Sequence, residues 1–83
     1  MFFVYAIQSL STKRTYIGQT RDVDQRLSYH NSGYVKSTRD DKPLKLLALQ
    51  KVPSRNEARW IERQLKKSKE KRKKWIEQNR IGK

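Results

Sequence analysis

The sequence predicts an α+β domain in which a small three-stranded, mostly antiparallel sheet is flanked by helices, an α/β sandwich-like arrangement. Three observations predict it. Residues 2–8 are rich in aromatic and β-branched side chains, as buried strands are. Residues 44–52 form a second apolar run, which Pro53 ends. Capping residues and apolar side chains at helical spacing indicate helices, giving the order strand, strand, helix, strand, helix, helix.

The first half of the chain is expected to form a hairpin and a short helix. Both faces of residues 2–8 are apolar, so this strand is expected at the centre of its sheet. A polar loop separates it from residues 15–20, and the two segments are predicted to pair as an antiparallel hairpin. Asp22 is the expected N-cap of a helix through about Asn31, and Gly33 lies where a left-handed residue ends a helix.

The second half begins with residues 34–43, which are polar, show no periodicity and are expected to form an ordered loop. After the strand at 44–52, Ser54 and Glu57 have the spacing of a capping box that starts a helix. The apolar stripe of this helix consists of Ala58, Ile61 and Leu65. A second helical stretch, from about residue 69 to 79, has as its packing residues Trp75 and Ile76.

Length and composition predict one compact domain over residues 1–83, with a lysine-rich C-terminal helical part at about 66–83. So small a core favours a shallow surface site over a deep pocket. No apolar run approaches the roughly 20 residues that a membrane span needs. The apolar N-terminus lacks the basic region and cleavage site of a secretory signal, and there is no cysteine. We therefore expect a cytoplasmic monomer that does not bind membranes.

Charge is the strongest compositional signal, because 21 Lys and Arg residues against eight Asp and Glu give a net charge of +13. On so small a surface this charge attracts polyanions, and nucleic acid is the expected partner. The alternatives are a solubility device, a ribosome-associated protein or a protein of anionic membrane surfaces. Charge alone does not separate DNA from RNA, or binding from cleavage. The candidate nucleic-acid-binding residues are Arg14, Arg21, Lys36, Arg39, Arg63, Lys66, Lys69, Lys71, Lys73 and Lys74.

One histidine occurs in the chain. His30 follows Arg26 by four residues on the predicted first helix, which puts both side chains on one helical face. They are candidates for a site, and the alternative is a solvated pair on a basic surface. Tyr5 and Tyr16 are predicted on adjacent strands, roughly opposite each other. Tyrosines in strands are usually packing residues with a solvated hydroxyl, which is the alternative here.

Glu62 is the acidic residue whose position favours chemistry. On a helix of about 100° per residue, it lies roughly 60° from Leu65 and 40° from Ala58, at the edge of the apolar stripe. A carboxylate there costs free energy unless it is paired or coordinates a metal. A carboxylate facing a polyanion also needs a cation between them, so an oxygen ligand for Mg²⁺ or Mn²⁺ fits both conditions. The alternative is a salt bridge to a nearby arginine.

Five short motifs, taken together, resemble the GIY-YIG nuclease family, in particular its small stand-alone bacterial endonuclease-like members. The resemblance covers nearly the whole chain, and Phe3 stands where the name-giving glycine would be. The matching segments are Val4-Tyr5-Ala6-Ile7, Tyr16-Ile17-Gly18, Gln25-Arg26-Leu27 with His30-Asn31-Ser32-Gly33, residues 36–49, and Ile61-Glu62-Arg63-Gln64-Leu65-Lys66.

The resemblance implies a metal-dependent DNA endonuclease that hydrolyses phosphodiester bonds with structure selectivity or weak sequence selectivity. The implied setting is DNA repair, recombination or mobile-element processing. One divalent cation, Mg²⁺ or Mn²⁺, would be held by Glu62 and would bind the scissile phosphate. The catalytic side chains are expected to converge on one shallow concave face. Two alternatives stay open: a non-catalytic nucleic-acid-binding module, for which RNA is not excluded, and a nuclease subunit active only with a protein partner.

The resemblance also implies a role for each remaining site residue. Tyr5 would accept a proton from the attacking water, with Tyr16 and His30 assisting the proton relay. Arg26 would neutralise the pentacovalent phosphate, which suits a planar and permanently charged donor. Gly18 would let the backbone come close to the site of the second tyrosine.

Overall fold

Strand β1 (Phe2–Ser9) lies at the centre of a three-stranded antiparallel sheet, between β2 (Thr15–Thr20) and β3 (Leu44–Val52). The computed structural model describes residues 1–82. The central place of β1, predicted from its two apolar faces, is confirmed. Strand β2 has no second neighbour within the described sheet, so its outer edge is open.

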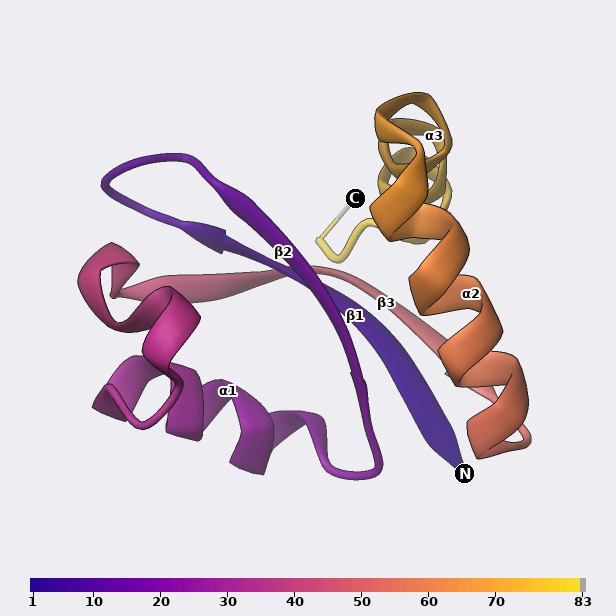
Figure 1. The fold of residues 1–83 in the computed structure, drawn as a ribbon, viewed down its shortest axis with the longest axis horizontal. Helices are drawn as coiled ribbons and strands as arrows, with labels where there is room; N and C mark the ends of the chain where they lie inside the picture. The colour runs from indigo at the N-terminus through magenta and orange to yellow at the C-terminus, as the bar shows by residue number, and fades with distance from the viewer. Residues whose placement is uncertain (83) are drawn as a thin grey trace.

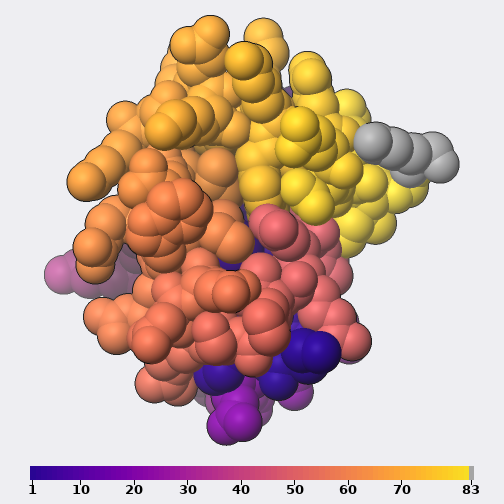
Figure 2. Space-filling view, turned by 90° about the vertical axis from the view of Figure 1, so that its right-hand side faces the viewer, coloured from indigo at the N-terminus to yellow at the C-terminus, as the bar shows by residue number. Residues whose placement is uncertain are grey.

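Helices cover both faces of the sheet (Figure 1). Helix α1 (Val23–Ser32) and the short 3₁₀ helix η1 (Lys36–Asp41) lie on one face, and α2 (Arg55–Lys67) and α3 (Lys69–Asn79) lie on the other. Helices α2 and α3 also form much of the surface on their side of the molecule (Figure 2). The predicted α+β class and element order are confirmed. Within residues 1–82, no helix has the length and apolar character needed to cross a membrane.

The core is divided between the two faces because side chains alternate along a strand. Two fully buried residues of β1, Val4 and Ala6, point toward α2 and α3. Their packing partners include Ala58, Leu65 and Trp75. The alternate residues Tyr5 and Ile7 point toward α1 and form a second, smaller cluster with Leu44. Tyr5 is thus packed as a core residue while its hydroxyl remains available for polar contacts.

The predicted caps Asp22, Ser54 and Gly33 are confirmed, and Ser68 is a further cap that was not predicted. Asp22, Ser54 and Ser68 each precede a helix and accept a hydrogen bond from the backbone N–H three residues later. Each such bond satisfies one of the unpaired N–H groups at a helix start. Gly33 ends α1 with φ of 87°, in the left-handed region that glycine adopts at little cost.

Two predictions about local structure need correction. Residues 34–43 were expected to form an ordered loop, and the structure contains the 3₁₀ helix η1 within it. A single 3₁₀ segment of polar residues has no apolar periodicity by which to find it. Tyr5 and Tyr16 were expected roughly opposite each other, but the hairpin register pairs Tyr5 with Gly18 and Tyr16 with Ile7. The two tyrosines share a face of the sheet and are offset by two residues.

Candidate active site

The site is organised by the close approach of Tyr5 to Gly18. A Cβ atom at Gly18 would overlap the hydroxyl end of the Tyr5 ring. The ring therefore crosses the face of β2 at the one position without a side chain, which carries the hydroxyl from the central strand toward the open edge of the sheet. Gly18 was expected to serve the second tyrosine, and the structure shows that it makes room for the first.

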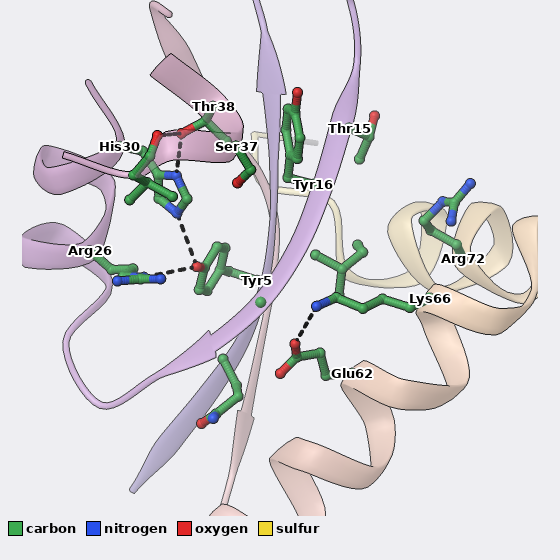
Figure 3. Close-up of a pocket in the computed structure, with 14 residues that line it drawn as sticks. Tyr5, Thr15, Tyr16, Arg26, His30, Ser37, Thr38, Glu62, Lys66 and Arg72 are labelled. Carbon is green, nitrogen blue, oxygen red and sulfur yellow. Dashed lines mark hydrogen bonds and ion pairs between the residues drawn. The ribbon is translucent and has the colours of Figure 1, made fainter. Parts of the chain in front are cut away.

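A chain of hydrogen bonds converges on the hydroxyl of Tyr5 (Figure 3). Nε of Arg26 donates to this oxygen at 3.4 Å, and Nε2 of His30 lies 3.2 Å from it. On the other side of the imidazole ring, Nδ1 of His30 lies 2.9 Å from Oγ1 of Thr38. Helix α1 presents Arg26 and His30 on one face, as their four-residue spacing predicted, and η1 supplies Thr38.

The contacts of Thr38 assign the tautomer of His30. The Thr38 hydroxyl donates to the backbone carbonyl of Val35 at 3.4 Å, so its oxygen is left to accept from Nδ1–H of His30. Nε2 of a neutral ring then carries a lone pair, which accepts the hydrogen bond of the Tyr5 hydroxyl. In this arrangement every buried donor has an acceptor, and the described residues contain no buried side-chain N or O atom without a partner.

His30 is held in its neutral form. Burial lowers its pKa from the ordinary value of 6.5, and the positive charge of Arg26 lowers the pKa further. The side chain is only 4% exposed, although it belongs to a very basic protein. A neutral, buried imidazole whose lone pair faces a phenol is suited to accept a proton from that phenol.

Tyr16 has a different environment from Tyr5. Its hydroxyl donates to the carboxylate of Asp41, and Nη1 of Arg14 lies 3.8 Å from the same carboxylate. The hydrogen bond to Asp41 raises the pKa of Tyr16, burial raises it further, and Arg14 opposes both effects. Tyr16 therefore stays protonated and acts as a hydrogen-bond donor. Sequence reasoning missed Asp41, a buried acid in a segment that has no periodic pattern.

Glu62 lies on the other side of β2 from Arg26 and His30, on helix α2 (Figure 3). One of its carboxylate oxygens is 2.7 Å from Nζ of Lys66, one helical turn later. The Glu62 side chain is 21% exposed, which agrees with its predicted place at the edge of the apolar stripe. The sequence left open a salt bridge to an arginine, and the observed partner is a lysine.

The two halves of the site meet in one cavity of about 430 Å³. Five predicted catalytic and metal-binding residues line it: Tyr5, Tyr16, Arg26, His30 and Glu62. Helices α1 and α2 lie on opposite faces of the sheet, so the expected single concave face is replaced by a cavity around the open edge of β2. Arg72 and Thr15 also line the cavity and were missed by the sequence prediction. Arg72 precedes the buried Trp75 by three residues, a spacing that could have identified it.

The predicted basic residues do not gather in this cavity. Lys66 is the one among them that lines it. Arg14 contacts Asp41, Arg21 stacks over the ring of Phe2 at 5.2 Å, and Arg39 donates to the carbonyl of Gly33. The others lie on α2, on α3 or at the start of η1: Arg63, Lys69, Lys71, Lys73, Lys74 and Lys36.

The donor groups fit one type of metal site. No group of three or more acidic or histidine side chains that could hold a metal occurs within residues 1–82. Glu62 can offer one carboxylate, and Mg²⁺ commonly binds through one or two carboxylates together with water and substrate phosphate oxygens. The site therefore fits a cation that is shared with a phosphate and does not fit a closed cage of protein ligands.

Taken together, these features define a small α+β domain with a cavity that brings together a tyrosine–histidine pair, an arginine guanidinium and a carboxylate. A family model described as the GIY-YIG catalytic domain matches residues 1–75. The chain belongs to the GIY-YIG family, in which this domain implies endonuclease activity.

One relative is the UPF0213 protein YsiG of Lactococcus lactis subsp. lactis (strain IL1403). It is 41% identical to this chain over 58 residues, which cover 69% of the chain and 55% of the relative. The matched part thus spans about half the length of this curated relative. No solved structure was found to match the chain.

Proposed function

We propose that this protein is a metal-dependent DNA endonuclease that acts in the cytoplasm and selects its substrate by DNA structure or by weak sequence preference. One observation carries the proposal. The cavity at the open edge of β2 joins the chain of Arg26, Tyr5 and His30 to the carboxylate of Glu62. Family membership and the net charge of +13 support the same substrate class.

The proton path starts at the water molecule that attacks phosphorus. As the new O–P bond forms, the water gives a proton to the oxygen of Tyr5, and Tyr5 passes its own proton to Nε2 of His30. Because His30 ends as an imidazolium, Tyr5 need not persist as a phenolate at neutral pH, where a free phenol is protonated. Before this transfer, Thr38 keeps the lone pair of the neutral ring on the Tyr5 side.

The breaking P–O bond leaves its electron pair on the departing oxygen, which then takes a proton from solvent. Arg26 is placed to balance the charge of the pentacovalent phosphate, since its guanidinium reaches the same cavity as Tyr5. Glu62 flanks the phosphate from α2. Lys66 flanks it from the same helix once the ion pair between Lys66 and Glu62 is broken. When bound at Glu62, a divalent cation supplies further charge stabilisation to the phosphate and the leaving group.

In our proposal, Tyr16 shapes the part of the cavity in which the substrate binds. Because its hydroxyl is committed to Asp41, it holds η1 against β2 and fixes one wall of the cavity. A role as base would require Tyr16 to lose its hydroxyl proton, which the hydrogen bond to Asp41 opposes by raising the pKa of Tyr16. We therefore assign proton acceptance to the pair Tyr5 and His30 alone.

The test is cleavage of flapped, branched and linear duplex DNA by the purified protein with Mn²⁺ or Mg²⁺, compared with the same reactions in EDTA. We expect metal-dependent cutting, with rates that differ among the DNA structures. Matched RNA substrates show whether the activity is restricted to DNA. Binding without cleavage on all substrates would contradict the proposal and would indicate a non-catalytic binding module. Cleavage only after addition of a cell extract would indicate a subunit that requires a partner.

A further inference from the structure

Two smaller hollows adjoin the catalytic cavity, one at each end of β2. A hollow of about 340 Å³ shares Gln19, Glu62 and Lys66 with the cavity. A second hollow, of about 270 Å³, shares Thr15 and Arg72 with it. Because neighbouring hollows share lining residues, the three form one groove along β2, with α2 and α3 as its far wall.

The sheet register explains the course of this groove. Ile17 packs in the core cluster below α2 and α3, so Thr15 and Gln19, two residues away on either side, share its face of β2. Gln19 marks one end of the groove and Thr15 the other. At about 3.3 Å per residue they are roughly 13 Å apart along the strand, which is the axial length of about four nucleotides of one DNA strand.

The walls of the groove are strongly basic at both ends. Beyond Glu62, the α2 end is lined by the cationic residues Arg59, Arg63, Lys66 and Lys67. The α3 end is lined by Lys69, Arg72 and Lys73, with Ile76 as an apolar contact. Glu62 is the one carboxylate that lines any of the three hollows, and Lys66 neutralises it. A continuous cationic groove with its catalytic groups at the centre is complementary to a polyanionic strand.

Helix geometry sorts the lysines of α3 into two sets. The groove-lining residues Lys69 and Lys73 are four residues apart and lie on one face of the helix. At about 100° per residue, Lys71 and Lys74 point roughly 180° and 120° away from the centre of that face, respectively. All four side chains are exposed. The lysine-rich segment therefore has a face toward the groove and a face away from it.

The geometry points to a bound DNA strand that runs along the open edge of β2, from the Arg63 end through the catalytic cavity to the Lys69 and Lys73 face of α3. The contacts are to phosphates, so this surface fixes the register of the strand and does not read its bases. This inference rests on the proposed function, because it takes the scissile phosphate to lie in the catalytic cavity. It predicts that Lys69 and Lys73 contact phosphates and that Lys71 and Lys74 do not.

The test compares two double variants that remove equal charge from the same exposed helix, Lys69→Gln with Lys73→Gln, and Lys71→Gln with Lys74→Gln. DNA affinity is measured by fluorescence anisotropy at several salt concentrations in EDTA, so that no cleavage occurs. For the first variant, we expect the slope of log affinity against log salt to become shallower, because two phosphate contacts are lost. Each lost contact contributes about 0.9 on duplex DNA and about 0.7 on a single strand, so the expected changes are about 1.8 and about 1.4. For the second, we expect the wild-type slope.

Equal slope changes in the two variants, or a larger change in the second, would overturn the groove assignment. The melting temperature of each variant verifies that both are folded. Cleavage by the wild type in Mn²⁺ separates this inference from the proposed function. If the wild type cleaves DNA and the slopes do not differ as expected, the groove is wrong and the nuclease stands. If the slopes differ as expected and no cleavage occurs, the groove stands and the nuclease proposal fails.

Discussion

The hydroxyl of Tyr5 lies 3.2 Å from Nε2 of His30, where the central strand of the sheet meets helix α1. This contact joins a residue of the first strand to a residue 25 positions later and converts two weak bases into one relay. Tyrosine alone titrates near pH 10, and His30, only 4% exposed, presents little surface to the substrate. Placed in contact, the tyrosine supplies the access and the histidine supplies the proton affinity.

The first prediction concerns pH. His30 accepts a proton only while neutral, and burial first and Arg26 second lower its pKa below 6.5. In a plot of the single-turnover rate against pH, the loss of activity on the acid side should therefore lie below pH 6.5. Cleavage should persist at pH 6.5. The unfolded chain binds this proton more readily than the folded one, so His30 contributes stability that declines as pH falls below 6.5. The NMR titration of the one histidine ring measures the midpoint directly, and a midpoint at or above 6.5 would contradict the assignment.

The second prediction tests the tautomer of His30. Thr38→Val keeps the shape of this fully buried side chain and removes the acceptor for Nδ1–H. An unpaired buried donor costs about 1–3 kcal/mol in the free energy of unfolding. The ring can avoid this cost by moving its proton to Nε2, which blocks the relay, so the cleavage rate should fall as well. Thr38→Ser retains the hydroxyl and should restore both the rate and the nitrogen shifts of His30; a Val variant with wild-type shifts would refute the role of Thr38.

The third prediction concerns Gly18. In Gly18→Ala, the new methyl group displaces the Tyr5 hydroxyl, because the two would overlap. A displacement of about 1 Å at a reacting group costs on the order of 100-fold in rate. We expect a loss of this size in the cleavage rate while DNA affinity stays near that of the wild type. Ser28→Ala, at an exposed position of α1 outside the cavity, is the control. Full activity of Gly18→Ala would show that the position of Tyr5 does not govern the reaction.

The fourth prediction concerns the cation. With a single carboxylate, the protein alone should bind Mn²⁺ weakly, and a non-cleavable DNA should tighten that binding by adding phosphate oxygens. Lys66 competes with the cation for Glu62, so Lys66→Gln should raise the Mn²⁺ affinity of the DNA-free protein. The Lys66 side chain is 56% exposed, and such pairs contribute about 0.2–1 kcal/mol, which corresponds to a rise of up to about fivefold. The electron paramagnetic resonance signal of free Mn²⁺ measures this. Lys67→Gln is the matched control, and an equal change in both variants would contradict the competition.

The sequence predicts most of the fold because its local signals agree with one another. The apolar run of β1, the capping residues Asp22 and Ser54, and the Trp75 position on α3 all have the partners expected of them. The segment η1 is the exception: it is held by contacts distant in sequence, such as the hydrogen bond from Tyr16 to Asp41. Contacts of that kind leave no local pattern in the chain.

The site could be predicted as a set of residues but not as an arrangement. Spacing places Arg26 and His30 on one helical face, and the bond of each to Tyr5 agrees with that placement. The pairing register of β1 and β2 determines how the other site residues are arranged. The pairing of Gly18 with Tyr5 and of Tyr16 with Ile7 gives the two tyrosines different neighbours, and strand propensities do not fix such a register.

The most direct test of the central claim is the metal-dependent cleavage rate of Glu62→Ala. The control variant is Glu77→Ala, which removes one carboxylate from an exposed position of α3. Both rates are measured under single-turnover conditions on the best DNA substrate with Mn²⁺, after the melting temperatures have shown that both variants are folded. We predict no metal-dependent cleavage by Glu62→Ala and a wild-type rate for Glu77→Ala. Wild-type cleavage by Glu62→Ala would contradict the account, because the cation would then have to bind elsewhere.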